Sequence, residues 1–134
     1  MKKGCNFIKS EKGQAVVEAA LILPLLLLFL CMIIDVGRIV YAEARLNSIC
    51  QESVRIAGLG GSDSQIHDYA YGQLDSQTAS TLKVYPNPTE AQGRKSGDFV
   101  TVKLSVDINY ITPFANVILP SPFNAVAQST IRIE

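Results

Sequence analysis

The carboxylate of Glu18 lies where the sequence otherwise predicts contact with lipid. Glu18 follows Gly13 by five residues and directly precedes residues 19–34, which are sixteen apolar positions without a charge. A charged group at bilayer depth costs a few kcal/mol unless it is paired. No lysine or arginine follows Glu18 until Arg38. We therefore expect a partner for Glu18 at the start of the same helix or on a neighbouring molecule.

Elsewhere the sequence offers few groups for catalysis or metal binding. His67 is the single histidine and has only Asp68 beside it, whereas a metal centre or a catalytic relay needs several convergent ligands or bases. The glycine-rich residues 58–61 lack the Lys and Ser/Thr of a phosphate-binding loop. We interpret His67 as a solvated polar residue. The sequence therefore predicts a protein that is not an enzyme, with no catalytic residue, no metal site and no cofactor.

The three cysteines, Cys5, Cys31 and Cys50, do not indicate a disulfide framework. Cys31 and Cys50 are 19 positions apart on what we interpret as one helix. That spacing corresponds to roughly 28 Å, whereas a disulfide needs Cα atoms within about 7 Å of each other. We expect no bond between these two thiols in one chain. A bond between Cys50 residues of two chains stays open.

Charge is unevenly distributed, although the formal net charge is zero. Residues 1–13 contain four lysines and one glutamate, so the rest of the chain carries the compensating negative charge. No basic face remains beyond residue 13, and nucleic-acid binding is not expected. Lysines before an apolar run mark the cytoplasmic side of a membrane. We therefore expect a single-pass cell membrane protein with a cytoplasmic N-terminus and an extracytoplasmic C-terminal part.

Residues 14–37 form the expected transmembrane helix. A bilayer core of ~30 Å takes roughly 20 helical residues, and Asp35 and Arg38 mark the outer end, one helical turn apart. Pro24 lies within the span and should bend it.

The helical pattern continues beyond the membrane as an amphipathic helix over residues 38–61. We expect one helix from about residue 14 to 57, ended by the glycines that follow. Its apolar stripe in the second half comprises Val36, Ile39, Val40, Leu46, Ile49, Cys50, Ser53, Val54 and Ala57.

Residues 62–134 predict a small extracytoplasmic α+β head. Strict alternation of apolar and polar residues over 100–110 indicates a strand, and shorter patterns at 82–84 and 125–133 indicate two more. We expect an antiparallel sheet of about three strands packed on the stripe of the long helix, because so small a sheet needs a cover.

The connections of the head include one segment that is unusual for a loop. A short second helix is expected over residues 66–74, and turns are expected at 85–88 and 93–97. Residues 113–122, in contrast, are mainly apolar. They are either a small plug of the core or an exposed contact patch for a membrane or a partner.

The order of a basic leader, Gly13, Glu18 and a long apolar helix resembles the class III signal of type IV pilin-like proteins. A more specific resemblance is carried by Gly13-Gln14-Ala15-Val16-Val17-Glu18-Ala19-Ala20, Leu23-Pro24-Leu25, Asp35-Val36-Gly37-Arg38, Tyr41-Ala42, Ala57 and the ending 125–134. In these residues the chain resembles the TadE-like family of tight-adherence pilus components.

The resemblance implies that a prepilin peptidase cuts between Gly13 and Gln14, so that residues 1–13 are a leader peptide. It implies a pilin-like fold and a minor pilin or pseudopilin of a tight-adherence (Flp-type) pilus, active in assembly, priming or tip formation. Glu18 would then serve recognition and assembly. The implied partners are the peptidase, other pilins and pseudopilins that contact the N-terminal helix, the inner-membrane assembly platform and the lipid bilayer.

Such a cut would explain the position of Glu18 physically. It removes four lysines, each of which contributes ~1 kcal/mol of attraction to an anionic inner surface. It also creates an α-amino cation on Gln14, one turn from Glu18 in the same helix and within reach of Glu18 of a neighbouring subunit. A simpler alternative is that Glu18 is an incidental interface residue, held by the positive helix N-terminus and by headgroup water.

Two other interpretations stay open. The chain could be an uncleaved bitopic scaffold of an envelope complex. It could also be a secreted soluble domain, released by cleavage after Ala44, although the apolar run exceeds the about 7–15 residues of a signal peptide. The mature N-terminal residue distinguishes the three interpretations, since it would be Gln14, Met1 or Arg45.

Overall fold

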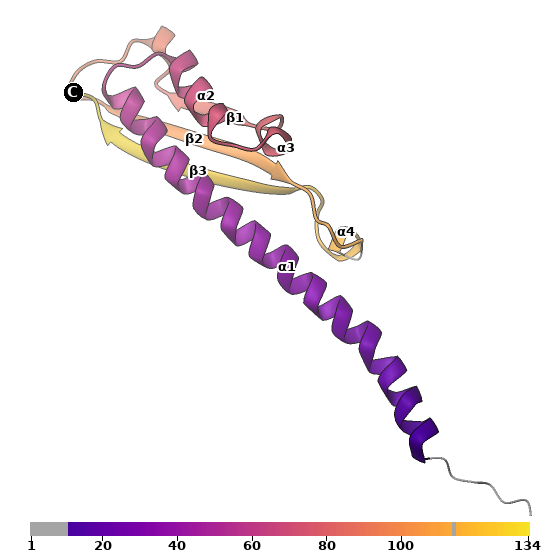
Figure 1. The fold of residues 1–134 in the computed structure, drawn as a ribbon. Helices are drawn as coiled ribbons and strands as arrows, with labels where there is room; N and C mark the ends of the chain where they lie inside the picture. Colours follow the sequence, from indigo (N-terminus) through magenta and orange to yellow (C-terminus); the bar gives the residue numbers. More distant parts are fainter. Residues whose placement is uncertain (1–10, 114) are drawn as a thin grey trace, which may run out of the picture.

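The computed structural model describes residues 11–113 and 115–134. Its main element is α1, Glu11–Gly58, a single helix of 48 residues that continues through Pro24. At 1.5 Å per residue, α1 is roughly 72 Å long. Figure 1 shows the first half of α1 extending away from the rest of the fold, while its second half lies against a sheet. The expected single helix is confirmed, and it begins slightly earlier than predicted.

Three antiparallel strands form the sheet, in the order β1-β2-β3. They are β1, Lys83–Asn87, β2, Phe99–Ile108, and β3, Phe123–Arg132. The strands β2 and β3 pair over their whole length, with Phe99 opposite Arg132 and Ile108 opposite Phe123. The predicted α+β arrangement, a long N-terminal helix packed on a small antiparallel sheet, is confirmed.

The core lies between α1 and one face of this sheet. The alternation of β2 buries every second side chain, as a half-buried strand requires. Full burial of one such aliphatic side chain stabilises the fold by about 1.5–3 kcal/mol. The buried residues that form the interface are Leu46, Ile49, Cys50, Val54 and Ala57 of α1, Val100, Val102, Leu104 and Val106 of β2, and Ala125 and Ala127 of β3.

The covered stripe of α1 begins later than predicted. Val36 and Val40 are exposed, and Ile39 is only partly buried. The reason is geometric, because β2 ends at Ile108 and the sheet does not extend as far as this part of the helix.

The chain turns later than the sequence predicts. The predicted turn at 85–88 is wrong, because Tyr85, Pro86 and Asn87 belong to β1, with Pro86 opposite Val102. β1 is an edge strand, where a residue without an N–H is tolerated. The chain turns instead over the short 3₁₀ helix η1, Glu90–Gln92, and continues through Gly93, which has a φ of +79°.

α1 ends in a glycine-dependent cap. Gly60 has a φ of +83°, and the N–H of Gly61 donates to the carbonyl of Ile56 at 2.9 Å. This is the Schellman pattern that closes a helix with a left-handed residue. A Cβ at Gly61 would lie 2.8 Å from the Ile56 oxygen, so the position requires glycine.

The second predicted helix is confirmed as α2, Asp63–Gly72, and it begins earlier than expected because Ser62 and Gln65 form a capping box. A short helix α3, Ser76–Ala79, follows it, capped by Asp75.

A buried arginine joins the start of α2 to the turn after β1. Arg94, whose side chain is almost fully buried, donates to the carbonyls of Gly61 at 2.5 Å and Pro88 at 3.2 Å, and it pairs with Asp63. Asp63 and Glu90 in turn each accept the backbone N–H of the other, at 3.1 and 3.2 Å. These side-chain bonds pair backbone carbonyls and N–H groups of the turn that no helix or strand partner satisfies.

Candidate membrane and assembly segment

The first half of α1 presents apolar side chains on all sides. Within residues 13–34, Leu28 alone is partly buried and every other residue is exposed. An apolar surface of this size on a soluble protein marks a membrane or protein contact. α1 is also long and apolar enough to cross a membrane. This half of the helix is therefore built to meet lipid or other helices rather than its own head.

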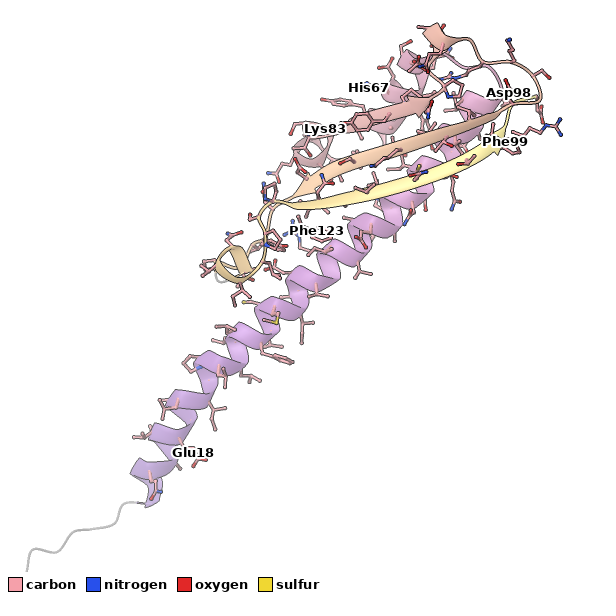
Figure 2. The ribbon with its side chains drawn as sticks, turned by 180° about the vertical axis from the view of Figure 1, so that it is seen from behind. Glu18, His67, Lys83, Asp98, Phe99 and Phe123 are labelled. Carbon is pink, nitrogen blue, oxygen red and sulfur yellow. The ribbon has the colours of Figure 1, made fainter. Side chains whose placement is uncertain are left out.

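Gly13 and Gln14 both lie within the first turn of α1, and Glu18 lies one turn after Gln14. Figure 2 shows Glu18 near the free end of the helix, far from the head. The Glu18 side chain is exposed and has no hydrogen bond or ion pair with any residue of the described chain. Residues at i and i+4 lie on the same helix face, so a charge at Gln14 would lie on the side of Glu18. The cleavage after Gly13 stays a prediction, and residues 1–10 lie outside the described part.

Asp35 is the polar residue that the fold buries at the end of the apolar run. It is 4% exposed, although both helix neighbours, Ile34 and Val36, are exposed. Its Oδ1 accepts the N–H of Ile111 and its Oδ2 accepts the N–H of Thr112, each at 3.0 Å. The carboxylate thus binds two successive amides just beyond the end of β2, which fixes the β2–β3 connection to α1.

Arg38 supports this junction from the next turn. Its Nη1 lies 4.0 Å from Asp35 Oδ1, and nearly half of its side chain is exposed. The sequence identified both residues as the outer end of the span. It did not identify the contact with the head. The available signal was that a carboxylate directly after an apolar run has to be satisfied once it is buried, but that rule does not name the partner.

Residues 13–55 match the family model described as TadE-like protein. The match confirms the resemblance that the sequence indicates, and it is to a pilin-type structural family associated with tight-adherence pili. No curated protein and no solved structure matches the chain.

The TadE-like region, residues 13–55, covers the exposed half of α1, the Asp35 junction and most of the helix that packs on the sheet. It begins at Gly13 and includes Glu18. The match does not extend to the head, residues 62–134, whose arrangement is therefore known from the structure alone.

Among its described residues, 113 and 115–122, the apolar connection between β2 and β3 is an exposed patch and not a plug of the core. Phe114 lies outside the described residues. It contains a short helix that the sequence did not predict, α4, Ala115–Ile118. Val117 is 83% exposed and Ile118 is 73% exposed. Of the two interpretations left open for residues 113–122, the structure supports the contact patch for the residues that it describes.

His67 lies on the exposed face of α2. Its ring stacks on Tyr71 with centroids 6.0 Å apart, and its Nδ1 lies 3.7 Å from Asp68. Among the described residues, no three His, Cys, Asp or Glu side chains gather as metal ligands would. A groove between α1, α3 and the end of β2 is lined by charges of both signs, which does not indicate one class of ligand.

Cys31 and Cys50 are both free thiols, as their spacing on one helix predicts. Cys50 is 1% exposed, and its Sγ donates to the carbonyl of Val102 at 3.2 Å. Burial raises the pKa of the Cys50 thiol. Because Cys50 lies within the core of the head, it is not placed to form the bond between two chains that the sequence left open.

Proposed function

We propose that the chain is a non-enzymatic minor pilin or pseudopilin of a tight-adherence (Flp-type) pilus. In this proposal residues 14–37 cross the cell membrane, the N-terminus is cytoplasmic and the head is extracytoplasmic. A prepilin peptidase removes residues 1–13, and the mature protein takes part in assembly, priming or tip formation. The single observation that carries the proposal is the exposed apolar half of α1 within the match to TadE-like proteins.

The architecture supports a role in which the helix, and not the head, makes the contacts with other subunits. A helix that is apolar on all sides needs neighbours throughout its length. Lipid supplies them before assembly, and the helices of other pilins and pseudopilins supply them within a filament. Removal of the leader lysines favours the exchange, because a helix without a cationic anchor is more easily withdrawn from an anionic membrane surface.

Glu18 provides the acidic partner for the charge that processing creates. The new α-amino group on Gln14 lies one turn away on the same face and is the nearest cation that processing would provide. Pairing removes most of the few kcal/mol that either charge costs at bilayer depth. In an assembly the same amine could instead reach Glu18 of the neighbouring subunit, which would make the pair a contact between chains. The inner-membrane platform is the expected place of that exchange.

The uncleaved bitopic scaffold remains the second candidate, and one observation favours it. α1 begins at Glu11, so the Gly13–Gln14 bond lies in a helical turn. The carbonyls of a helix are engaged in hydrogen bonds, and a peptidase would have to unwind this turn before attacking the bond. The secreted form is less favoured, because cleavage after Ala44 would remove Asp35 and leave the amides of Ile111 and Thr112 without their acceptor.

Affinity purification of the wild-type chain and its Glu18 variants tests the proposal. The wild-type chain is expected to co-purify with the pilus assembly machinery. Glu18→Ala should be inserted and processed but should not join the assembly, because the Gln14 amine then has no acidic partner. Glu18→Gln should be intermediate, since it keeps hydrogen bonding but not charge.

Asp68→Ala is a matched control, because this carboxylate is exposed on α2 of the head. It should behave as the wild type. Absence of the machinery from the wild-type purification would contradict the proposed function. Normal co-purification and pilus yield for processed Glu18→Ala would contradict the pairing role alone.

A further inference from the structure

The connection between β2 and β3 exposes four aliphatic side chains, Ile111, Val117, Ile118 and Leu119, which we call the apolar tip. We propose that the apolar tip inserts into the outer leaflet of the membrane beside α1, as a second membrane contact of the same chain. This inference rests on the proposed membrane span. It assigns a lipid-binding surface to the head, outside the TadE-like region.

The composition of the connection fits lipid and not water. No charged residue occurs between Asp107 and Arg132, and Val117, Ile118 and Leu119 lie near the centre of that stretch. Loops on a protein surface are ordinarily polar, since they face water. Here two of the most exposed large apolar side chains of the head, Val117 and Ile118, lie next to each other on α4.

The position of the tip is set by the Asp35 clamp. Asp35 directly follows the last residue of the apolar run, and its two oxygens bind the amides of Ile111 and Thr112. The connection is therefore held at the height where the span ends. Figures 1 and 2 both show α4 beyond the ends of β2 and β3, beside the middle of α1 and toward its free half.

The clamp also meets a requirement of the lipid environment. An unsatisfied backbone N–H costs several kcal/mol in hydrocarbon, so non-helical backbone is tolerated near a membrane only where its polar groups are paired. Asp35 pairs two such groups at the point where the connection leaves the sheet. The hydroxyl of Tyr110 donates to the carbonyl of Pro120 at 3.3 Å and pairs one acceptor on the returning side of the connection.

Two features of the apolar tip favour lipid over a partner protein. It is continuous with the apolar surface of α1, and it is too small for an ordinary protein interface. Met32, Ile33 and Ile34 of α1 are exposed directly before the clamp, so the tip extends an apolar surface that the span already presents. A protein interface of standard size uses roughly 20–30 residues a side, whereas the tip offers four. Apolar side chains of interfacial segments insert about 5–10 Å into the boundary of headgroups and acyl chains, a depth that a short connection can reach.

Depth-dependent quenching of a single tryptophan tests this inference. The chain contains no tryptophan, so Val117→Trp introduces the only one. The full chain is reconstituted in phosphatidylcholine vesicles with bromine atoms either near the glycerol end or near the terminus of the acyl chains. The tip tryptophan is expected to lose most of its emission with bromines near the glycerol end and little with bromines near the terminus.

Two further variants make the result interpretable. Leu25→Trp lies in the exposed span and should be quenched most by bromines near the chain terminus. Tyr85→Trp is exposed on β1 and should not be quenched. Quenching of Leu25→Trp without quenching of Val117→Trp would overturn the inference while leaving the proposed span intact. If Leu25→Trp is not quenched, the proposed span fails and this inference fails with it.

A contact between the tips of two copies of the chain would give a different result. The emission of Val117→Trp would shift to shorter wavelength as the protein-to-lipid ratio rises, without quenching by either brominated lipid. That result would also overturn the lipid assignment. Ile118→Asp added to Val117→Trp should abolish the quenching at the tip, because a carboxylate beside it opposes insertion.

Discussion

The carboxylate of Asp35 binds the backbone amide of Thr112, 77 positions later in the chain, at 3.0 Å. This contact joins the outer end of the apolar helix to the connection between the two long strands. It holds the connection between β2 and β3 beside the outer end of the proposed span. The Asp35 contact thus adds a polar link to the apolar packing of Leu46, Ile49 and Val54 of α1 against the sheet.

Asp35→Ala should loosen this junction. Two amides, Ile111 and Thr112, lose their acceptor, and a buried donor left unsatisfied costs about 1–3 kcal/mol. We expect the amides of residues 111–112 to exchange hydrogen markedly faster in the full chain in detergent, while those of β2 change little. Asp35→Glu keeps the carboxylate and should show a smaller effect. Unchanged exchange at both amides in Asp35→Ala would show that the clamp is not formed.

Arg94→Met should destabilise the head. Arg94 satisfies the carbonyls of Gly61 and Pro88 and pairs with Asp63, and methionine keeps most of its volume without any donor. We expect the free energy of unfolding of the head to fall by about 2–4 kcal/mol. This free energy is measured by urea titration of the full chain in detergent, with hydrogen exchange of the β2 amides as the readout.

Lys95→Met is the matched control, since Lys95 is adjacent and exposed. It should leave the unfolding curve nearly unchanged. Equal effects of the two substitutions would mean that the Arg94 bonds do not stabilise the turn.

Cys50 should make the head less stable at alkaline pH. Burial raises the pKa of its thiol in the folded state, while the unfolded thiol ionises at about pH 8.5. Above that pH the unfolded state loses a proton that the folded state retains, so stability falls as pH rises. Cys50→Ala should therefore show a smaller loss of unfolding free energy than the wild type between about pH 8 and about pH 10, by at most about 1.4 kcal/mol per pH unit.

Cys31→Ala serves as the comparison in that experiment. Cys31 lies in the exposed half of α1, outside the core of the head. Its removal should leave the pH dependence as in the wild type. The same alkaline slope in the wild type and in Cys50→Ala would contradict the role of the Cys50 thiol.

Gly13→Leu should leave an unprocessed precursor in the membrane, because the peptidase must approach the backbone where only a small residue allows it. Gly37→Leu is the control, since a Cβ at Gly37 meets nothing within 4 Å and the residue lies outside the predicted cleavage site. We expect the second variant to be processed as the wild type is. Normal processing of Gly13→Leu, judged by the mass of the intact protein, would place the cut elsewhere.

The local patterns of the sequence predicted most of the elements. The periodicity of α1 and the alternation of β2 arise from burial on one face, which is visible in neighbouring residues. The turn at 85–88 was wrong because pairing with β2 overrides the local preference of Pro86. The late start of the covered stripe, which leaves Val36 and Val40 exposed, depends on where the sheet ends. That boundary is not encoded near either residue.

The residues of the candidate site also fall into two groups, those that a local pattern could predict and those that depend on the tertiary structure. Gly13 and Glu18 could be named because their types and spacing occur within one short stretch that resembles a known signal. The partner of Asp35 could not be named, since Ile111 and Thr112 contribute backbone N–H groups, which every residue except proline carries. The exposure of the apolar tip likewise follows from the tertiary position of the connection and not from its composition, which also suits a core plug.

The central claim is that the chain is a processed, pilin-like subunit. The most direct test is the N-terminal residue of the native protein. It is determined by mass spectrometry on protein purified from the membranes of the cells that produce it. The account predicts that the mature chain begins at Gln14, without residues 1–13. A native protein that begins at Met1, or at Arg45, would contradict it.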